Sequence, residues 1–278
     1  MHYCPNSLVQ SPRVSVAFFK KNKTQDDFYN ELIRNRRGSH LFSCGYSERF
    51  DPFLLDQKPF LARVYEGLFS SLFSDKVTSI LDVGCGTGLY WPVLAQYGGD
   101  ISGIDSSESM IDEAKRLVAA KSLNHIKPSV QNSGDIQFPD GSFDVVLCVD
   151  ALHHIPQLRR AVGEFHRVLK PGGRFLAVEP NMFNPLMFLA HLIPPEERYG
   201  VVRSFAPILR SVFRPHFENI QIRYVNYVAS ATSKEQLQRV ESIGNVLVEI
   251  PLLRSLSLRQ TLSMTKRVAS TLSSARGG

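Results

Sequence analysis

The chain has 278 residues, of which 43% are hydrophobic and 21% are charged, a balance typical of a water-soluble globular protein. This length suits one large α/β domain with additions or two small domains. The longest apolar run, residues 185–194, is interrupted by His191 and is too short to span a bilayer, so the sequence predicts no transmembrane segment.

The formal net charge of +6 comes from the two ends of the chain. Residues 1–25 contain four basic and no acidic side chains, and the residues after position 250 contain five basic and none acidic. Residues 26–250 contain 23 basic and 26 acidic side chains, so the charge does not indicate a basic face on the core. Solvated tails are the simplest interpretation, and weak contact of a basic end with RNA or an anionic membrane surface is the alternative.

The cysteine pattern indicates a reducing compartment. Cys4, Cys44, Cys85 and Cys148 show no metal-ligand spacing, so we predict no metal site. The apolar patch at residues 14–19 is too brief for a secretory signal. We therefore expect reduced thiols and a cytoplasmic protein, while the sequence leaves its oligomeric state open.

Residues 1–25 form a polar, basic segment without periodicity, which we expect to be disordered. Residues 26–75 are predicted to form a helical cap, with a short helix at 26–35 and an amphipathic helix at 58–73. The loop between these helices contains Tyr46.

Strand and helix signals alternate through residues 76–181, which predicts a core with a parallel sheet. The run at 143–149 is almost continuously apolar, as expected of a strand buried on both faces. Strands are predicted at 79–83, 101–104, 127–131, 143–149 and 174–178, with helices at 89–96, from Ser106 or Ser107 to about 118, and at 158–169.

The alternation stops after residue 181. Residues 182–213 are rich in Met, Phe, Leu and Pro and predict short helices over the carboxyl edge of the sheet. A strand is predicted at 220–228, a helix at 234–256 with a break at Pro251, and a last strand at 258–268. Residues 182–268 thus combine lid helices with two strands that complete the sheet, and 269–278 are expected to be a flexible tail.

The most informative stretch is residues 80–88, Ile-Leu-Asp-Val-Gly-Cys-Gly-Thr-Gly. A short apolar strand containing Asp82 is followed by three glycines at alternate positions and then by a helix, the opening of a nucleotide-binding βαβ unit. The spacing differs from the Gly-x-Gly-x-x-Gly of dinucleotide sites, which argues against a nicotinamide dehydrogenase. Asp82 would repel a diphosphate and suits a ligand with an ammonium or sulfonium group.

Residues 80–88 resemble the first motif of the class I S-adenosylmethionine-dependent methyltransferases. Residues 134–135, 138–144 and 168–173 also match this family, so the resemblance covers 79–181. It implies a Rossmann-like α/β fold with a mostly parallel seven-stranded sheet, an antiparallel C-terminal hairpin, helices on both faces and a helical lid. It also implies S-adenosyl-L-methionine as the cofactor and an N-terminal segment that covers it.

Acidic residues lie at or just after the carboxyl ends of four predicted strands: Asp82, Asp105, Asp135 and Asp150. Open parallel sheets bind ligands beyond the carboxyl ends of their strands, and the donor groups of S-adenosylmethionine match carboxylates. The resemblance assigns Asp105 to the ribose hydroxyls, Asp135 with Ile136 to adenine, and Asp82 to the ammonium end. It assigns the backbone of Gly84, Cys85 and Gly86 to the methionine part and Met110 to adenosine packing, and it completes the cofactor set with Gly88, Ser106 and Val149.

Methyl transfer requires mainly alignment of the acceptor and exclusion of water, with a base only where the acceptor loses a proton. His154, and after it His153, are the candidate bases because they follow Asp150. Glu179 and Asn181, at the end of the fifth strand, are expected to face the same crevice and to orient the acceptor. Tyr46 and Tyr199 are the further candidate substrate-binding residues.

Absent motifs narrow the acceptor. No Asn-Pro-Pro-aromatic motif follows the fourth strand, and the double-glutamate loop of arginine methyltransferases is missing. We predict a small-molecule acceptor, such as a quinone, a lipid, a sugar or a natural-product intermediate. A tRNA-modifying methyltransferase that uses the basic ends is the alternative enzyme, and a catalytically idle cofactor-binding partner is the alternative of another class. The lid would be apolar through Phe183, Met187, Phe188, Leu189, Leu192, Tyr199 and Phe205.

Overall fold

The structure is a computed structural model of the chain. It describes residues 29, 30, 33, 50–74, 77–192, 198, 200–226, 233–250 and 253–267, and every structural statement below concerns these residues.

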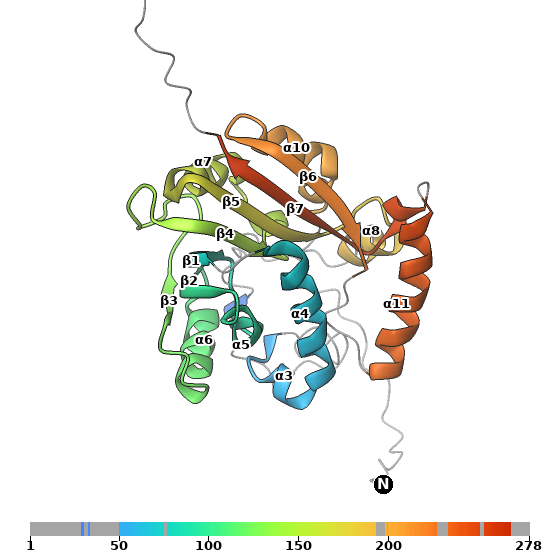
Figure 1. Cartoon of the computed structure of the whole chain (residues 1–278), viewed down its shortest axis with the longest axis horizontal. Helices are drawn as coiled ribbons and strands as arrows, with labels where there is room; N and C mark the ends of the chain where they lie inside the picture. The colour runs from blue at the N-terminus through green and yellow to red at the C-terminus, as the bar shows by residue number, and fades with distance from the viewer. Residues whose placement is uncertain are drawn as a thin grey trace, which may run out of the picture.

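A seven-stranded sheet forms the centre of the molecule, in the order β3-β2-β1-β4-β5-β7-β6 (Figure 1). The first five strands of this order pair in parallel, and β7 pairs antiparallel with both β5 and β6. The predicted fold class is therefore confirmed, including the antiparallel C-terminal hairpin. The strands are β1 (Val77–Val83), β2 (Gly98–Asp105), β3 (Ile126–Val130), β4 (Phe143–Val149), β5 (Leu169–Pro180), β6 (Phe217–Val225) and β7 (Arg259–Lys266).

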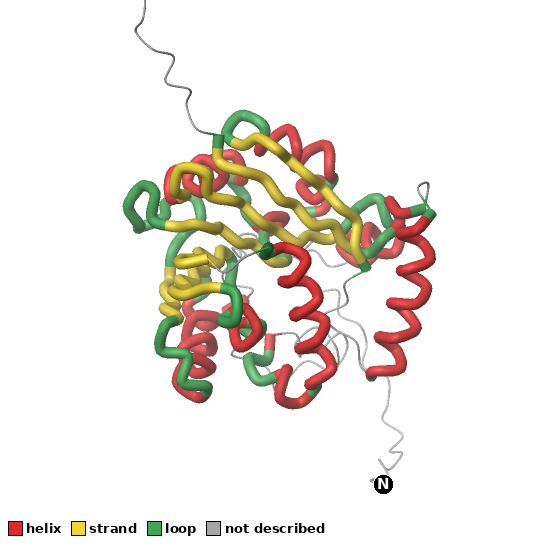
Figure 2. The backbone as a smooth tube through the Cα atoms, in the orientation of Figure 1, coloured by secondary structure: helices red, strands yellow, loops and turns green. Residues whose placement is uncertain are grey.

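Helices cover both faces of this sheet (Figure 2). The α-helices are α3 (Leu54–Gln57), α4 (Pro59–Leu72), α5 (Trp91–Leu94), α6 (Glu108–Ala120), α7 (Leu158–Val168), α8 (Pro185–Leu192), α10 (Ala206–Phe213) and α11 (Lys234–Glu249). The part of the chain that the structure describes also includes three short 3₁₀ helices in the connections: η2 (Leu152–His154), η3 (Val201–Ser204) and η4 (Arg254–Leu256).

The apolar side chains on the two faces of β4 belong to two separate core clusters. Val145 and Leu147 pack with residues of α4, α5 and α6, whereas Val146 and Cys148 pack with α7, α10 and the C-terminal hairpin. Successive side chains of a strand point to opposite faces, so a run apolar at every position must be covered twice. The second cluster cannot close without residues after 200, because Phe213 and Phe217 lie inside it.

Several predicted boundaries were wrong: β2 begins at Gly98 and not at 101, β5 at Leu169 and not at 174, and β6 at Phe217 and not at 220. The helix predicted at 89–96 is only Trp91–Leu94, because the glycine turn continues through Tyr90 and Trp91 N–H donates to the Gly88 carbonyl at 2.8 Å. The helix predicted to end at 169 ends at Val168, and β5 begins directly at Leu169. The Pro-Gly-Gly sequence that we took as a helix stop lies inside β5, where the pairing with β4 shifts register.

Candidate functional site

The turn after β1 has a backbone that favours glycine at three positions. Gly84, Gly86 and Gly88 have φ angles of 68°, 54° and 70°, in the left-handed region. A Cβ atom at Gly84 would meet Ala151 Cβ at 2.5 Å, and one at Gly88 would meet the Trp91 ring at 2.4 Å. A Cβ atom at Gly86 would have nothing within 4 Å. Gly84 and Gly88 are therefore required by packing, while Gly86 borders open space.

Asp105 connects this turn to the start of α6. Its carboxylate accepts hydrogen bonds from the backbone N–H groups of Gly86 and Ser107, both at 2.9 Å. The Ser107 side chain in turn caps α6 by accepting from Met110 N–H at 3.3 Å. A carboxylate has about four acceptor positions. Asp105 thus holds the turn and also lines the cavity.

A cavity of about 670 Å³ opens beyond the carboxyl ends of the strands, within the usual range for small-molecule sites. The strand order decides which groups are neighbours along it. Asp135 follows β3, Asp105 follows β2, the glycine turn follows β1, and Asp150 with His154 follows β4. Four separate segments of sequence thus line a single hollow.

Asp82 lies beneath the turn and is fully buried, outside the cavity lining. Tyr90 O–H donates to both of its oxygens, at 2.9 and 3.0 Å, and Trp91 Nε1–H donates at 2.7 Å. Burial raises the pKa of the Asp82 carboxyl to about 7, although these hydrogen bonds act in the opposite direction. Asp82 thus supports the turn from inside. Its predicted contact with the ammonium end of a cofactor remains a prediction.

Cys85 lines the cavity within the same turn. Burial, together with the nearby Asp82 and Asp105 carboxylates, raises the pKa of its thiol. A thiol held in its protonated form is a poor nucleophile. Cys85 therefore contributes surface to the cavity and does not act as a nucleophile.

The end of β4 contributes a charged residue and a histidine. Asp150 has a φ of 52° and forms an ion pair with Arg259 of β7, with 2.6 Å between Oδ1 and Nη1. His154 Nε2 lies 3.0 Å from the hydroxyl of Tyr29, and the Tyr29 ring meets the Phe50 ring edge-on at 5.7 Å. Tyr29 and Phe50 thus line the cavity from the N-terminal part of the chain, and the covering of a cofactor by this segment remains a prediction.

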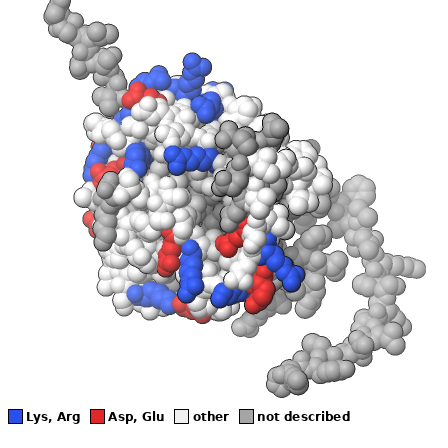
Figure 3. Space-filling model, turned by 45° about the vertical axis from the view of Figure 1, so that its right-hand side comes forward, with Lys and Arg blue, Asp and Glu red and all other residues white. Residues whose placement is uncertain are grey.

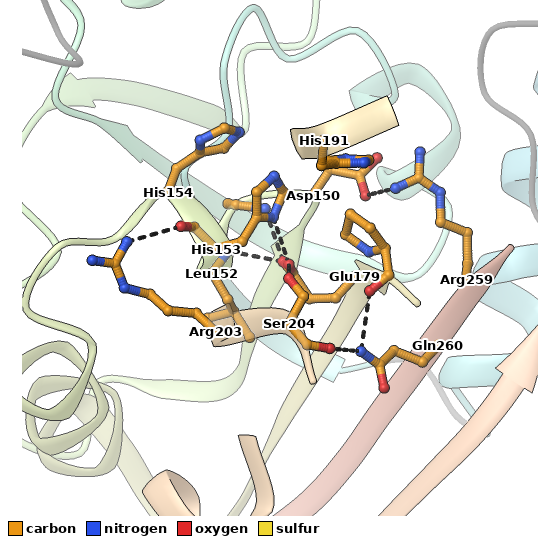
Figure 4. A network of polar contacts seen from close by, with 12 residues as sticks. Asp150, Leu152, His153, His154, Glu179, His191, Arg203, Ser204, Arg259 and Gln260 are labelled. Carbon is orange, nitrogen blue, oxygen red and sulfur yellow. Dashed lines mark hydrogen bonds and ion pairs between the residues drawn. The ribbon is translucent and has the colours of Figure 1, made fainter. Parts of the chain in front are cut away.

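His153 and Glu179 face the interior of the protein (Figure 4). The Glu179 carboxylate is fully buried and accepts from Ala151 N–H at 3.0 Å and Leu152 N–H at 2.8 Å. His153 Nδ1 lies 2.6 Å from its second oxygen, which indicates that this nitrogen carries the donated proton. Glu179 thus holds the backbone of η2, and His154 on η2 is the histidine that reaches the cavity.

The expectation that Glu179 and Asn181 face the crevice was wrong. Neither lines the cavity, and both are fully buried. Asn181 Nδ2 donates to the carbonyls of Ser255 at 2.6 Å and Ser257 at 2.8 Å. The fifth strand therefore ends in side chains that bind the protein's own backbone, which a pattern of strand-end polar residues does not reveal.

The cavity lining includes most of the predicted cofactor residues and one candidate base: Gly84, Cys85, Gly86, Asp105, Ser106, Met110, Asp135, Val149, Asp150 and His154. Six predicted residues lie behind it: Asp82, Gly88, Ile136, His153, Glu179 and Asn181. Tyr46 and Tyr199 lie outside the described residues.

Sequence reasoning missed Tyr29, Phe50, Tyr65, Tyr90 and Arg160 as lining residues. Tyr90 had a usable signal, because an aromatic pair lies one residue beyond the glycine motif and a buried carboxylate needs donors. Tyr29 and Phe50 had none, since they lie far from the core in the sequence.

Comparisons with known proteins agree with this geometry. Residues 81–177 match the family model described as a methyltransferase domain. The matched curated relatives include an uncharacterized methyltransferase, YcgJ, from Bacillus subtilis strain 168, which is 34% identical over 36% of this chain and 40% of its own length. A demethylmenaquinone methyltransferase from Symbiobacterium thermophilum is 39% identical over 36% of this chain and 41% of its own. A ubiquinone biosynthesis O-methyltransferase from Coxiella burnetii is 37% identical over 34% and 40%.

Solved structures extend the similarity of fold beyond the matched segment. A putative methyltransferase in complex with the Trm112 methyltransferase activator of Haloferax volcanii superposes with a TM-score of 0.58, covering 86% of this chain and 98% of that one at 14% identity. A SAM-dependent methyltransferase from Aquifex aeolicus gives a TM-score of 0.53, covering 87% and 99% at 17% identity. At these identities the likeness shows the fold alone.

The predicted resemblance to class I S-adenosylmethionine-dependent methyltransferases is confirmed by these matches. The chain spans about two-fifths of the length of the curated relatives it matches. The matched sequence covers most of the cavity lining and stops before α8, α10 and the C-terminal hairpin, and none of the described residues of 182–267, the segment predicted to hold the lid, lines the cavity.

Proposed function

We propose that this protein, which carries a class I methyltransferase domain over residues 81–177, transfers a methyl group from S-adenosylmethionine to a small-molecule acceptor. One observation carries the proposal. The order of the strands places Asp135, Asp105 and the Gly84–Gly86 turn side by side in one cavity, in the order in which adenine, ribose and the amino acid follow one another in that cofactor.

The residues present fit this cofactor chemically. Asp105 would accept hydrogen bonds from the ribose hydroxyls and Asp135 from the adenine amine, since both carboxylates line the cavity. The space beside Gly86 would admit the amino-acid part against the backbone. When bound, S-adenosylmethionine supplies a methyl group already activated by its sulfonium charge. The protein's own contribution is then to align the acceptor and to exclude water.

The β4 side of the cavity supports an acceptor that is at least partly aromatic. Tyr29 and Phe50 offer ring surfaces there, and His154 offers an imidazole within hydrogen-bond distance of the Tyr29 hydroxyl. We propose an aromatic hydroxyl or quinol-like acceptor, from which His154 removes the proton as the acceptor oxygen or carbon is methylated. The names of two matched relatives, acting on demethylmenaquinone and in ubiquinone biosynthesis, support this choice.

Calorimetric titration with S-adenosylhomocysteine tests the cofactor assignment. We expect the full chain to bind it, and Asp105→Asn to bind it about 10- to 100-fold more weakly, because charge-assisted hydrogen bonds to the ribose are lost, at about 1–3 kcal/mol. Asp100→Asn is the matched control, since Asp100 is an exposed aspartate on the same strand, away from the cavity. Failure of the wild-type chain to bind would refute the proposal.

Transfer of label from methyl-labelled S-adenosylmethionine tests the acceptor. In a panel of phenols and quinols with and without isoprenoid chains, we expect at least one compound to receive the labelled methyl group. Sugars and tRNA should remain unlabelled. Labelling of tRNA with none of the quinols labelled would contradict the proposed acceptor class and leave the cofactor assignment standing.

A further inference from the structure

Helix α8 is apolar but unburied. Every one of its residues except His191 is apolar, and none is buried. Leu186 is 71% exposed and Leu189 is 52% exposed. A helix that is apolar on all sides normally lies inside a protein or in a membrane. The exposure of α8 therefore indicates a surface that binds another protein, a ligand or a membrane.

The exposed apolar surface continues onto the neighbouring elements. Val202 on η3 is 62% exposed, and η3 packs against both α8 and α10. Phe183, just before α8, meets Phe205 edge-on at 5.3 Å, which joins the two sides of the surface. We call this surface the α8 face and define it by Phe183, Leu186, Leu189, Leu192, Val202 and Ile208.

The charged side chains that the structure describes in this part of the sequence are all basic. Between 181 and 217 these residues include no Asp or Glu, and Glu196 and Glu197 lie outside them. Arg198 Nε donates to the Leu192 carbonyl at 3.1 Å, which places one guanidinium at the end of α8. The space-filling view shows a surface that is mostly white, with Lys and Arg frequent at the top and charges of both signs at the bottom (Figure 3). The exposed arginines of this stretch are Arg198, Arg210 and Arg214, whereas Arg203 is half-buried.

The inner side of the same elements is fixed to the active-site region. Val201 and Ser204 of η3 are buried, and the Ser204 hydroxyl donates to Glu179 at 3.3 Å. Arg203 Nη1 donates to the His153 carbonyl at 3.1 Å (Figure 4). The α8 face is therefore the outer side of a well-anchored layer whose inner side holds η2, the 3₁₀ helix that contributes His154 to the cavity.

We propose that the α8 face is a docking surface for a membrane that contains anionic lipids. Apolar side chains that enter the boundary of the acyl chains, bordered by arginines that meet anionic headgroups, are the features that hold a helix in the plane of a bilayer surface. Docking would be peripheral, because no helix of the described chain has the length and apolar character that crossing a membrane requires. The inference does not depend on methyl transfer.

Flotation of the full-length protein with vesicles tests this docking. The two vesicle types are phosphatidylcholine alone and an equal mixture of phosphatidylcholine and phosphatidylglycerol. We expect binding to the mixed vesicles, with weaker binding at high salt and on neutral vesicles. The double variant Leu186→Ser, Leu189→Ser should bind the mixed vesicles at least about tenfold more weakly, because two leucine side chains that would enter the membrane are lost from the contact.

Val130→Ser is the matched control, because Val130 is 49% exposed at the end of β3, on the opposite edge of the sheet from the hairpin. It should bind vesicles as the wild type does. Both leucines are exposed, so unchanged thermal unfolding should show that the double variant is folded. Equal binding by the double variant would assign any membrane affinity to the basic chain ends and overturn the proposal. Absence of vesicle binding, with a dimer in size-exclusion chromatography that the double variant abolishes, would overturn it in favour of an interface between two copies.

Discussion

Asp82 and Asp105 follow or end neighbouring strands, yet their surroundings differ. Asp82 is fully buried and receives hydrogen bonds from Tyr90 and Trp91, whereas Asp105 lines the cavity and holds two backbone N–H groups. A buried carboxyl whose pKa is raised to about 7 exchanges its proton near neutral pH. Asp82 therefore ties the stability of the glycine turn to pH, while Asp105 is placed to bind ligand.

Asp82→Asn should change the pH dependence of stability. The folded pKa of about 7 lies above the ordinary value of 3.8, so the folded state binds more protons between these values. The Asp82 contribution is therefore fully present below pH 3.8 and is lost as pH rises through about 7. Relative to the wild type, Asp82→Asn should become more stable across this window, by at most about 4 kcal/mol.

Urea denaturation over a range of pH measures this difference, with Asp100→Asn as the control whose stability should follow that of the wild type. A constant difference between Asp82→Asn and the wild type at all pH values would show that Asp82 does not titrate in this range.

His154→Asn tests the proposed base. Turnover of a hydroxyl acceptor should fall by about 10²–10⁴-fold, because the proton acceptor is removed. Affinity for S-adenosylhomocysteine should change little. His166→Asn is the control, since His166 lies on α7 with its Nε2 against the Arg267 carbonyl, outside the cavity lining. Full activity of His154→Asn would eliminate the residue as base.

The sequence located the cofactor side of the site better than the acceptor side, for a physical reason. Asp105, Asp135 and the glycines each follow a strand of the parallel sheet, and the carboxyl ends of such strands must meet at one edge. Tyr29 and Phe50 reach the cavity only through tertiary packing of the N-terminal cap. Glu179 follows the same strand-end rule as Asp105, but the chain uses its carboxylate to satisfy backbone donors of η2.

At the scale of secondary-structure elements, two glycines in regular structure should respond in opposite ways to alanine. Gly103 lies on β2, paired with Asp82 of β1, and a Cβ atom there would meet Trp91 Cζ2 at 2.2 Å and Cys85 Sγ at 3.1 Å. Gly67 lies in α4, where a Cβ atom would have nothing within 4 Å. At Gly103 the neighbouring side chains leave no room for a methyl group, whereas at Gly67 there is room for one.

Gly103→Ala should destabilise the protein by about 1–3 kcal/mol, because Trp91 is fully buried and the methyl group overpacks the space beside it. Gly67→Ala should stabilise it by about 0.5–1 kcal/mol, because alanine loses less backbone entropy in a helix. The free energy of unfolding from urea titrations measures both. Equal stability of the two variants would mean that the β2–α5 contact is looser than the structure shows.

The boundary between α7 and β5 was predicted wrongly because its sequence signals are ambiguous. Pro171, Gly172 and Gly173 are strong helix-stop signals, but they also fit a strand irregularity, and here they lie within β5 where Gly172 has a φ of 75°. The local sequence is therefore compatible with a helix end and with a strand irregularity. Pairing with β4 selects the strand, and hydrophobic periodicity does not reveal that pairing.

At the scale of the whole molecule, the segment that matches the methyltransferase family is not a closed unit. β5 is buried between β4 and β7, and β7 pairs with it from Arg174 to Pro180. The core cluster around Phe175 includes Phe213 and Phe217, both fully buried. The C-terminal third therefore supplies both a strand partner and the cover of one sheet face.

A chain that ends at Asn181 should consequently fail to fold cooperatively. It would leave β5 as an apolar edge strand and would expose Phe175 to water, which favours aggregation over a native state. We expect no sigmoidal thermal transition by circular dichroism and no binding of S-adenosylhomocysteine. A chain that ends at Arg267 retains β7 and should behave as the full chain does. Because every predicted cofactor residue lies before 181, cofactor binding by the shorter fragment would show that the hairpin and α10 are dispensable for the site, and that the sheet is held together by its parallel half.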